Sequence, residues 1–110
     1  MIDWERVATL RDEVGEESFD EVVALFLEEV DELVAQLEAS PDPERLERDL
    51  HFLKGGALNL GFQEFGLLCQ AGERLAATGR ATAVDLAAVL ALYAQSRRQF
   101  LTQLGRSAAA

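Results

Sequence analysis

His51 and Lys54 are the only histidine and the only lysine in the 110-residue chain, and they lie three residues apart. If this stretch is helical, Arg48 and Lys54 lie on either side of the histidine, because residues three apart are neighbours on a helix surface. An imidazole is largely neutral at neutral pH, and its unprotonated nitrogen is a good nucleophile. Flanking cations would stabilise an added phosphoryl group, whose transfer depends mostly on positioning and charge neutralisation. The spacing therefore fits a phosphoryl-accepting histidine supported by Lys54 and Arg48, and an exposed histidine without a chemical role is the alternative.

Two adjacent glycines, Gly55 and Gly56, follow the lysine inside an otherwise helical pattern. Each glycine costs a helix interior roughly 1 kcal/mol relative to alanine, so the pair needs a reason such as the close approach of another surface. Gly55 lies one turn after His51 and leaves its imidazole uncrowded, so we interpret it as a docking residue. Gly56 falls on the other flank, and we interpret it as a site of close packing with a neighbouring helix.

Helical spacing places the histidine away from the core. The buried face is defined by a stripe of apolar residues: Leu46, Leu50, Leu53, Ala57 and Leu60. At roughly 100° per residue, His51 falls about 140° from the centre of that stripe. Arg48 and Gly55 fall beside it, Leu58 flanks it as an exposed apolar spot, and Asn59 lies a little further round. We therefore expect Gly55, Leu58 and Asn59 to form part of a docking surface around an exposed His51.

The charge of the chain is distributed unevenly. The net charge of −10 argues against nucleic acid as a partner. Residues 1–44 hold 15 acidic residues against two arginines, for a net charge of −13, whereas residues 45–110 hold 5 acidic and 8 basic residues, for a net charge of +3. The half with the histidine is therefore locally basic, and we interpret the acidic first half as a solvated surface that favours solubility.

Composition excludes several other classes of protein. Apolar residues make up 49% and charged residues 27% of the chain, as in ordinary globular domains. We find neither a long apolar run nor a basic-then-apolar leader, so we expect no membrane span and a cytoplasmic protein. The single cysteine, Cys69, excludes an internal disulfide and fits a reducing cytosol. One histidine and one cysteine are too few for structural zinc, and no loop has the carboxylate spacing of a metal site, so we expect no metal ligands.

The spacing of apolar residues predicts the fold. They recur every three or four residues along nearly the whole chain, without persistent period-two alternation, so we predict an all-α protein. Short loops between the helices predict an antiparallel up-down four-helix bundle, with a short N-terminal helix across one end. We expect one domain over residues 1–110, with a cap helix over 1–15, the four-helix bundle over 16–106 and a frayed tail over 107–110.

Capping residues predict where the helices begin. Ser18 and Glu21 have the spacing of a capping box, and Asp42 followed by Pro43 is typical of a helix start. Thr82, with an aspartate three residues later, predicts the start of the last helix. The expected helices cover residues 3–14, 18–37, 43–60, 62–78 and the stretch from 82 onward. At core positions of these helices we expect Cys69 and six aromatic residues: Trp4, Phe19, Phe26, Phe62, Phe65 and Phe100.

The stretch around the histidine resembles a known signature. The run 51–55, His-Phe-Leu-Lys-Gly, followed by Gly61 ten residues after the histidine, is similar to the signature of histidine-containing phosphotransfer (HPt) domains of two-component phosphorelays. The run 59–62, Asn-Leu-Gly-Phe, resembles the usual end of that helix. Leu68-Cys69 on the following helix, and the length of the preceding helix with Phe26 inward, also agree. The resemblance extends over nearly the whole chain.

The resemblance implies a function for these residues. His51 would accept a phosphoryl group from the aspartyl phosphate of a receiver domain and pass it to the aspartate of another receiver. Lys54 would help to hold the phosphoryl oxygens, and Gly55 would leave room for the loops of the receiver. The partners would be receivers of response regulators or hybrid histidine kinases, docking on helices 18–37 and 43–60. The Mg²⁺ would belong to the receiver, with no cofactor bound by this chain.

One position departs from the pattern of some relatives, which place a glutamine on the next helix to hydrogen-bond the imidazole. The matching residue is Glu73. Its carboxylate can accept the ring N–H, but it would lie unfavourably close to a bound phosphoryl group. We therefore expect Glu73 to pair with a cation on the flank of its helix, and we keep orientation of His51 as the alternative role.

Other functions remain open at the level of sequence. The chain lacks a phosphate-binding loop and room for a nucleotide-binding domain, so we expect a phosphoryl carrier without autokinase activity. One alternative is an adaptor bundle in which His51 is exposed but never phosphorylated. Another is a phosphatase that acts on a phosphorylated receiver. Each predicted helix shows one clear apolar stripe, so we expect a monomer.

Overall fold

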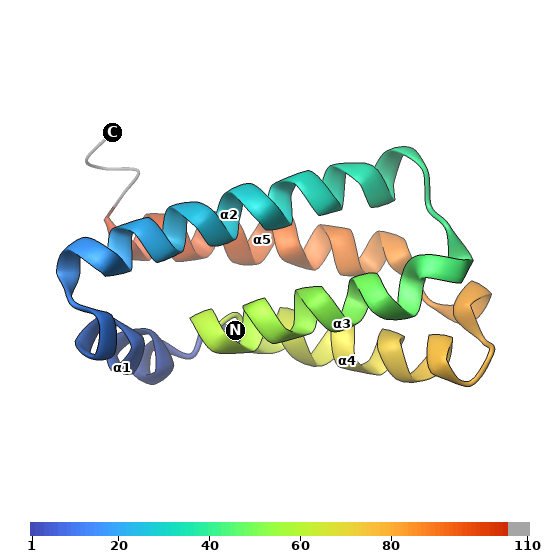
Figure 1. Ribbon diagram of the computed structural model, residues 1–110, viewed down its shortest axis with the longest axis horizontal. Coiled ribbons are helices and arrows are strands. Elements are labelled where there is room, and N and C mark those ends of the chain that lie inside the picture. The colour runs from blue at the N-terminus through green and yellow to red at the C-terminus, as the bar shows by residue number, and fades with distance from the viewer. Residues whose placement is uncertain (106–110) are drawn as a thin grey trace.

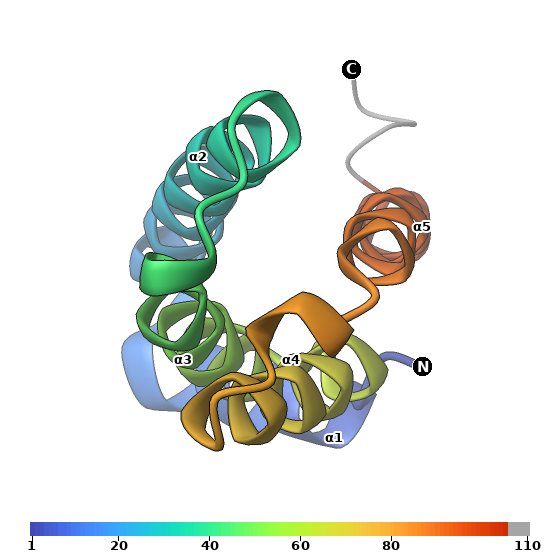
Figure 2. The same ribbon diagram turned by 90° about the vertical axis from the view of Figure 1, so that its right-hand side faces the viewer.

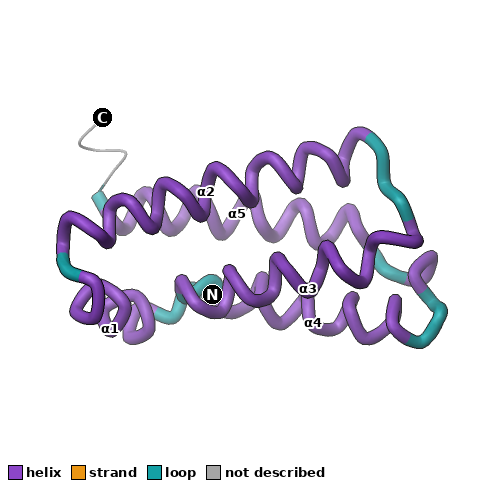
Figure 3. The backbone as a smooth tube through the Cα atoms, viewed as in Figure 1, coloured by secondary structure: helices purple, strands orange, loops and turns teal. Residues whose placement is uncertain are grey.

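The structure is a computed structural model that describes residues 1–105. Within them it contains five α-helices and one short 3-10 helix, with loops between them (Figure 3). The elements are α1 (Trp4–Val14), α2 (Glu16–Ala39), α3 (Pro43–Leu60), α4 (Gln63–Ala77), η1 (Ala81–Ala83) and α5 (Leu86–Leu104). The predicted all-α class is confirmed, whereas the tail expected at residues 107–110 lies outside the described residues.

The helices form an up-down bundle. Consecutive long helices α2, α3, α4 and α5 run in opposite directions, and α1 lies across one end (Figure 1). Viewed along the bundle, the four long helices surround a common core in the order α2, α3, α4, α5 (Figure 2). Helix α5 thereby lies beside α2, and Tyr93 and Arg97 of α5 donate hydrogen bonds to Asp31 of α2.

Helix starts follow the expected caps at two places. The side chain of Asp3 accepts a hydrogen bond from the backbone N–H of Arg6 at the start of α1. Asp42 caps α3 by accepting from the N–H of Glu44, with Pro43 in the first turn. A cap of this kind satisfies a backbone donor that the helix itself leaves unpaired.

The predicted capping box at Ser18 and Glu21 is wrong. Helix α2 begins at Glu16, directly after Gly15, and no side chain caps it. Gly15 has a φ of 84°, a conformation that favours glycine, so one residue suffices to turn the chain from α1 into α2. Ser18 consequently lies within the first turn of the helix and not in front of it.

The predicted start of the last helix at Thr82 is also wrong. Thr82 lies in the short 3-10 helix η1, and α5 begins later, at Leu86. Asp85 is the capping residue, and its side chain accepts a hydrogen bond from the N–H of Ala88 at 3.1 Å. The aspartate that the prediction placed inside the helix, three residues after Thr82, is therefore itself the cap.

Aromatic residues fill the core as expected. Phe19, Phe62, Phe65 and Phe100 are fully buried, while Trp4 and Phe26 are half-buried against the same cluster. Cys69 is fully buried too, which confirms its predicted place. The ring of Trp4 stacks on that of Phe100, with centroids 5.6 Å apart, so a residue of the cap helix closes the end of the core.

Close packing between α3 and α4 sets the position of the site, and two glycines of α4 make it possible. A Cβ atom on Gly66 would lie 2.5 Å from a methyl carbon of Leu58, and one on Gly72 would lie 2.8 Å from a methyl carbon of Leu50. Side chains of α3 therefore occupy the space that larger residues on α4 would need. This approach brings the outward face of α3 next to the flank of α4.

The end of α3 is held by the cap helix. Gly61 ends α3 with a φ of 99°, and its carbonyl accepts a hydrogen bond from the N–H of Asp3 at 2.7 Å. The guanidinium of Arg6 donates to both the backbone oxygen and the side-chain oxygen of Asn59, each at 2.8 Å. These contacts fix the C-terminal turn of α3 relative to α1.

Candidate functional site

His51 lies near the middle of α3, on its outward face. Its side chain is 67% exposed, as the helical spacing predicts. Backbone hydrogen bonds of the helix fix its Cα position, while the neighbouring residues Leu50 and Leu53 anchor the opposite face of α3 in the core. The imidazole is therefore presented to solvent from a rigid element.

Glu73 of α4 lies against the imidazole. Its Oε2 atom is 2.8 Å from Nδ1 of His51, across the line where α3 and α4 pack. An ionised carboxylate can only accept hydrogen bonds. Nδ1 of His51 therefore carries the proton and donates a hydrogen bond to Glu73. The lone pair of the neutral ring then resides on Nε2, the nitrogen that remains free to react.

The same carboxylate binds Lys54. Oε1 of Glu73 lies 3.0 Å from Nζ of Lys54, and both side chains are about one-fifth exposed, at 19% and 21%. Glu73 thus bridges His51 and Lys54, each through a separate oxygen. The lysine lowers the pKa of the Glu73 carboxyl from its ordinary value, an effect that burial opposes and that the hydrogen bond with His51 reinforces. The bridging carboxylate is therefore ionised at neutral pH.

Arg48 lies one turn before His51 and is exposed. It lines a shallow hollow of about 420 Å³ at the surface together with Glu44, Glu47, His51 and Glu73. Glu44 and Glu47 were not predicted to lie near the histidine, although their positions seven and four residues before it put them on its side of the helix. The hollow therefore combines one guanidinium with three carboxylates around the imidazole.

The two adjacent glycines have different surroundings. A Cβ atom on Gly55 would meet nothing within 4 Å, so the space beside His51 is open. A Cβ atom on Gly56 would lie 3.1 Å from Cε1 of Phe26 in α2, which confirms the close packing expected there. Gly56 admits a helix of the bundle itself, and Gly55 leaves the outward surface clear.

Leu58 and Asn59 were expected to be part of the open docking surface, but both contact neighbouring helices. Leu58 is 37% exposed, but its side chain leans over Gly66 and so belongs partly to the contact with α4. Asn59 is exposed, yet Arg6 occupies both of its oxygens. Neither residue contacts His51 through a hydrogen bond in the described part of the chain.

Phe52 is an exposed aromatic residue that the sequence argument missed. It follows His51 directly and is 49% exposed. The available signal was its position about 100° further round the helix, opposite the buried stripe. Leu25 of α2, 56% exposed, is another large apolar side chain that faces solvent on the helices expected to dock a receiver. Exposed apolar residues of this size are typical of interaction surfaces.

Cys69 lies on α4 one turn before Glu73, and its thiol is held in the protonated, unreactive form. Burial raises the pKa of its thiol to about 12, and the nearby Glu73 carboxylate adds to that shift. A thiol with so high a pKa forms little thiolate, the reactive species, at neutral pH. Cys69 is therefore a packing residue beneath the site.

Among residues 1–105, no group of three or more histidine, cysteine, aspartate or glutamate side chains is arranged to hold a metal ion. No helix in that part of the chain combines the length and the apolar character that crossing a membrane requires.

Comparison with known proteins gives one match. The family model for the Hpt domain matches residues 21–107, which includes the whole of α3 and α4 and hence every residue of the hollow. Neither the curated proteins nor the solved structures contain a match to the chain.

Proposed function

The chain belongs to the Hpt domain family and has a phosphotransfer role in phosphorelays, and from this premise we propose that His51 is its phosphoryl acceptor. In this proposal His51 receives the phosphoryl group from an aspartyl phosphate of one receiver domain and relays it to the aspartate of another. The observation that carries the proposal is the exposed imidazole of His51, whose Nδ1 is held by Glu73 while Nε2 has no hydrogen-bond partner among the described residues.

The reaction follows from that tautomer. The lone pair of Nε2 attacks the phosphorus atom in line with the bond to the aspartyl oxygen of the receiver. The N–P bond forms as the P–O bond breaks, and the aspartate leaves as a carboxylate. Because Nε2 carries no proton, no base is needed to activate it. The ring gains positive character in this step, and the carboxylate of Glu73 at Nδ1 stabilises it.

Lys54 and Arg48 supply the cations for the phosphoryl oxygens. In the free protein the ammonium of Lys54 is paired with Glu73, which keeps it beside the imidazole. Its long flexible side chain can turn from the carboxylate to a phosphoryl group on Nε2 while it remains next to both. Arg48 on the preceding turn approaches the same group from the other side of His51.

Docking of the receiver uses the open surface around the histidine. Gly55 leaves space for the loops of the receiver, and the exposed side chains of Phe52 and Leu25 provide apolar contacts on α3 and α2. Leu58 and Asn59 lie further along α3, where they contribute to the edge of this surface. The Mg²⁺ that transfer requires is bound by the receiver, and the chain acts as a monomer.

A transfer assay tests the proposal. A panel of receivers from the same genome is phosphorylated with labelled phosphate, and each is mixed with the protein and Mg²⁺. We expect label on this chain that is labile in acid and stable in alkali, as phosphohistidine is, and no label on His51→Gln. Release of the label as inorganic phosphate with no labelled chain would instead indicate a phosphatase. Receivers that all keep their label would favour an adaptor.

A further inference from the structure

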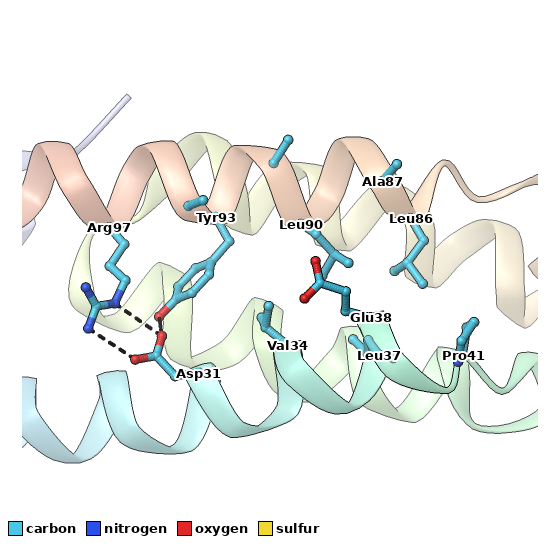
Figure 4. Close-up of a pocket in the computed structure, with 12 residues that line it drawn as sticks. Asp31, Val34, Leu37, Glu38, Pro41, Leu86, Ala87, Leu90, Tyr93 and Arg97 are labelled. Carbon is cyan, nitrogen blue, oxygen red and sulfur yellow. Dashed lines mark hydrogen bonds and ion pairs between the residues drawn. The ribbon is translucent and has the colours of Figure 1, made fainter.

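A groove runs between α2 and α5, on a side of the bundle that the phosphotransfer site does not use. Its volume is about 700 Å³, and Figure 4 shows the side chains along it. The lining residues come from both helices and from the turn after α2: Asp31, Val34, Leu37, Glu38, Pro41, Leu86, Ala87, Leu90, Ala91, Tyr93, Ala94 and Arg97. None of them lines the hollow around His51, which lies between α3 and α4.

Most of this groove is apolar. Val34, Leu86 and Leu90 are only partly buried, and they pack against the hydrophobic core of the bundle. Exposed alanines on α5, among them Ala91 and Ala94, extend the apolar surface outward. Because alanine side chains are short, another backbone can approach α5 closely along this edge. The groove therefore offers an unfilled apolar surface to a second element.

The polar groups at the groove leave it negatively charged. Asp31 accepts hydrogen bonds from Tyr93 at 2.6 Å and from Arg97 at 3.2 and 3.1 Å, so this aspartate and this arginine neutralise each other. The carboxylate of Glu38 points into the groove between the two helices (Figure 4). Arg97 is the cation that lines the groove, and it is bound to Asp31, so no cation pairs with Glu38 among the described residues.

The two walls differ in charge beyond the lining residues. Helix α2 carries nine acidic residues and no basic one, whereas α5 carries two arginines and no acidic residue. Glu28 lies three residues before Asp31 and is exposed, so it continues the acidic edge of the groove along α2. An element that enters the groove thus meets carboxylates along α2 and apolar or basic side chains along α5.

The length of the groove fits a helix. Its lining on α5 runs from Leu86 to Arg97, which at 1.5 Å per residue is about 16 Å, or three helical turns. An amphipathic helix that places its apolar face between two others is a common mode of recognition. Apolar walls with one acidic edge call for a helix whose polar face carries lysine or arginine.

We propose that the α2–α5 groove docks an amphipathic helix of a partner protein, with its apolar face toward Leu90 and Ala94 and its basic edge toward Glu38. A second copy of this chain fits poorly, because its net charge is −10 and its own α2 would bring acid against acid. Since the groove and the hollow share no residue, a bound helix leaves His51 accessible to a receiver. The proposal therefore goes beyond phosphotransfer and stands or falls without it.

Fluorescence anisotropy tests the proposal. The probe is a labelled 18-residue helical peptide of leucine and lysine with its leucines on one face, and its counterpart has glutamate in place of lysine. We expect saturable one-to-one binding of the lysine peptide at micromolar concentration and at least tenfold weaker binding of the glutamate peptide, about 1.4 kcal/mol. Equal binding of the two peptides, or no saturable binding of either, would overturn the proposal.

Matched variants locate the binding. Ala94→Gln fills the groove without changing charge, and we expect it to weaken binding roughly tenfold. Ala71→Gln makes the same change at an exposed position of α4 outside the groove and should leave binding within about twofold. Equal effects of the two substitutions would show adhesion to the acidic surface alone and refute the groove. A dimer of the free chain that Ala94→Gln dissociates would refute it in favour of a second copy.

Discussion

Glu73 of α4 holds His51 of α3 through a single contact, 2.8 Å between Oε2 and Nδ1. The other oxygen of the same carboxylate binds Lys54 at 3.0 Å. One side chain therefore sets the tautomer of the imidazole and keeps a cation beside it. With His51 as the proposed phosphoryl acceptor, this relationship predicts a separate role for each residue, and substitutions can distinguish those roles.

Removing the carboxylate of Glu73 should slow the phosphorylation of His51 by a receiver. Glu73→Ala leaves Nδ1 without an acceptor, so the ring is free to rotate and to place its proton on either nitrogen. We expect phosphorylation of His51 by a receiver to be about 10–100-fold slower, as when the hydrogen-bond partner of a functional histidine is lost. Glu73→Gln, whose amide oxygen still accepts from Nδ1, should be less affected. The control is Glu47→Ala, which removes another acid of the hollow; an equal loss in that variant would contradict the role of Glu73.

Removing the lysine should act on the phosphorylated form. Lys54→Ala takes away a cation that can bind the phosphoryl oxygens, and a charge-assisted hydrogen bond of this kind contributes about 1.5–3 kcal/mol. We expect transfer to slow, or the phosphohistidine lifetime to shorten, by roughly tenfold. Circular dichroism should show an unchanged bundle, because the side chain lies on the flank of α3. An unaltered rate and lifetime would leave Lys54 as the ion-pair partner of Glu73 alone.

The adjacent glycines should respond differently to the same substitution. Gly55→Ala adds a methyl group where nothing lies within 4 Å, so it should raise the free energy of unfolding by about 1 kcal/mol. Gly56→Ala places its methyl 3.1 Å from the ring of Phe26 and should gain less or lose stability. Urea unfolding of both variants measures the difference. Gly55→Leu should keep the stability yet slow transfer, and unimpaired transfer by that variant would refute the docking role of Gly55.

Acid should weaken the contribution of Glu73 to stability. The pKa of this carboxyl is lower in the folded chain than the ordinary value of about 4.3, chiefly because of Lys54. Its contribution is therefore complete above the ordinary value and is lost as the pH falls through the lowered pKa of the folded state. We expect the stability difference between the wild type and Glu73→Gln to shrink as urea unfolding is repeated from pH 7 down to pH 3. A difference that stays constant over this range would contradict the ion pair.

Much of the site follows from local patterns. The apolar stripe of α3 is enough to predict that His51 faces solvent, because the core stripe and the helical period leave it no other side. The same reasoning predicts an open surface at Gly55 and a packed one at Gly56. The helical spacing of α3 also places Phe52 away from the buried stripe, although its exposure was not predicted.

The rest depends on contacts between distant residues. His51 and Glu73 are separated by 22 positions, and they meet because Leu58 and Leu50 pack where Gly66 and Gly72 have no side chains. The spacing of residues within one helix does not show that α3 and α4 pack so closely. The bond from Arg6 to Asn59 spans 53 positions and is equally invisible in the pattern of one helix. The wrong capping box at Ser18 arose differently, because a glycine turn replaced the expected side-chain cap.

The position of the phosphoryl group on the imidazole tests the central claim most directly. The chain is labelled with ¹⁵N in histidine, phosphorylated by a receiver and examined by NMR, which distinguishes the two ring nitrogens. We predict that phosphorus is bonded to Nε2 of His51 and that Nδ1 carries a proton, because Glu73 holds that nitrogen in the free protein. A phosphoryl group on Nδ1, or a phosphorylated chain whose histidine signals are unchanged, would contradict the account.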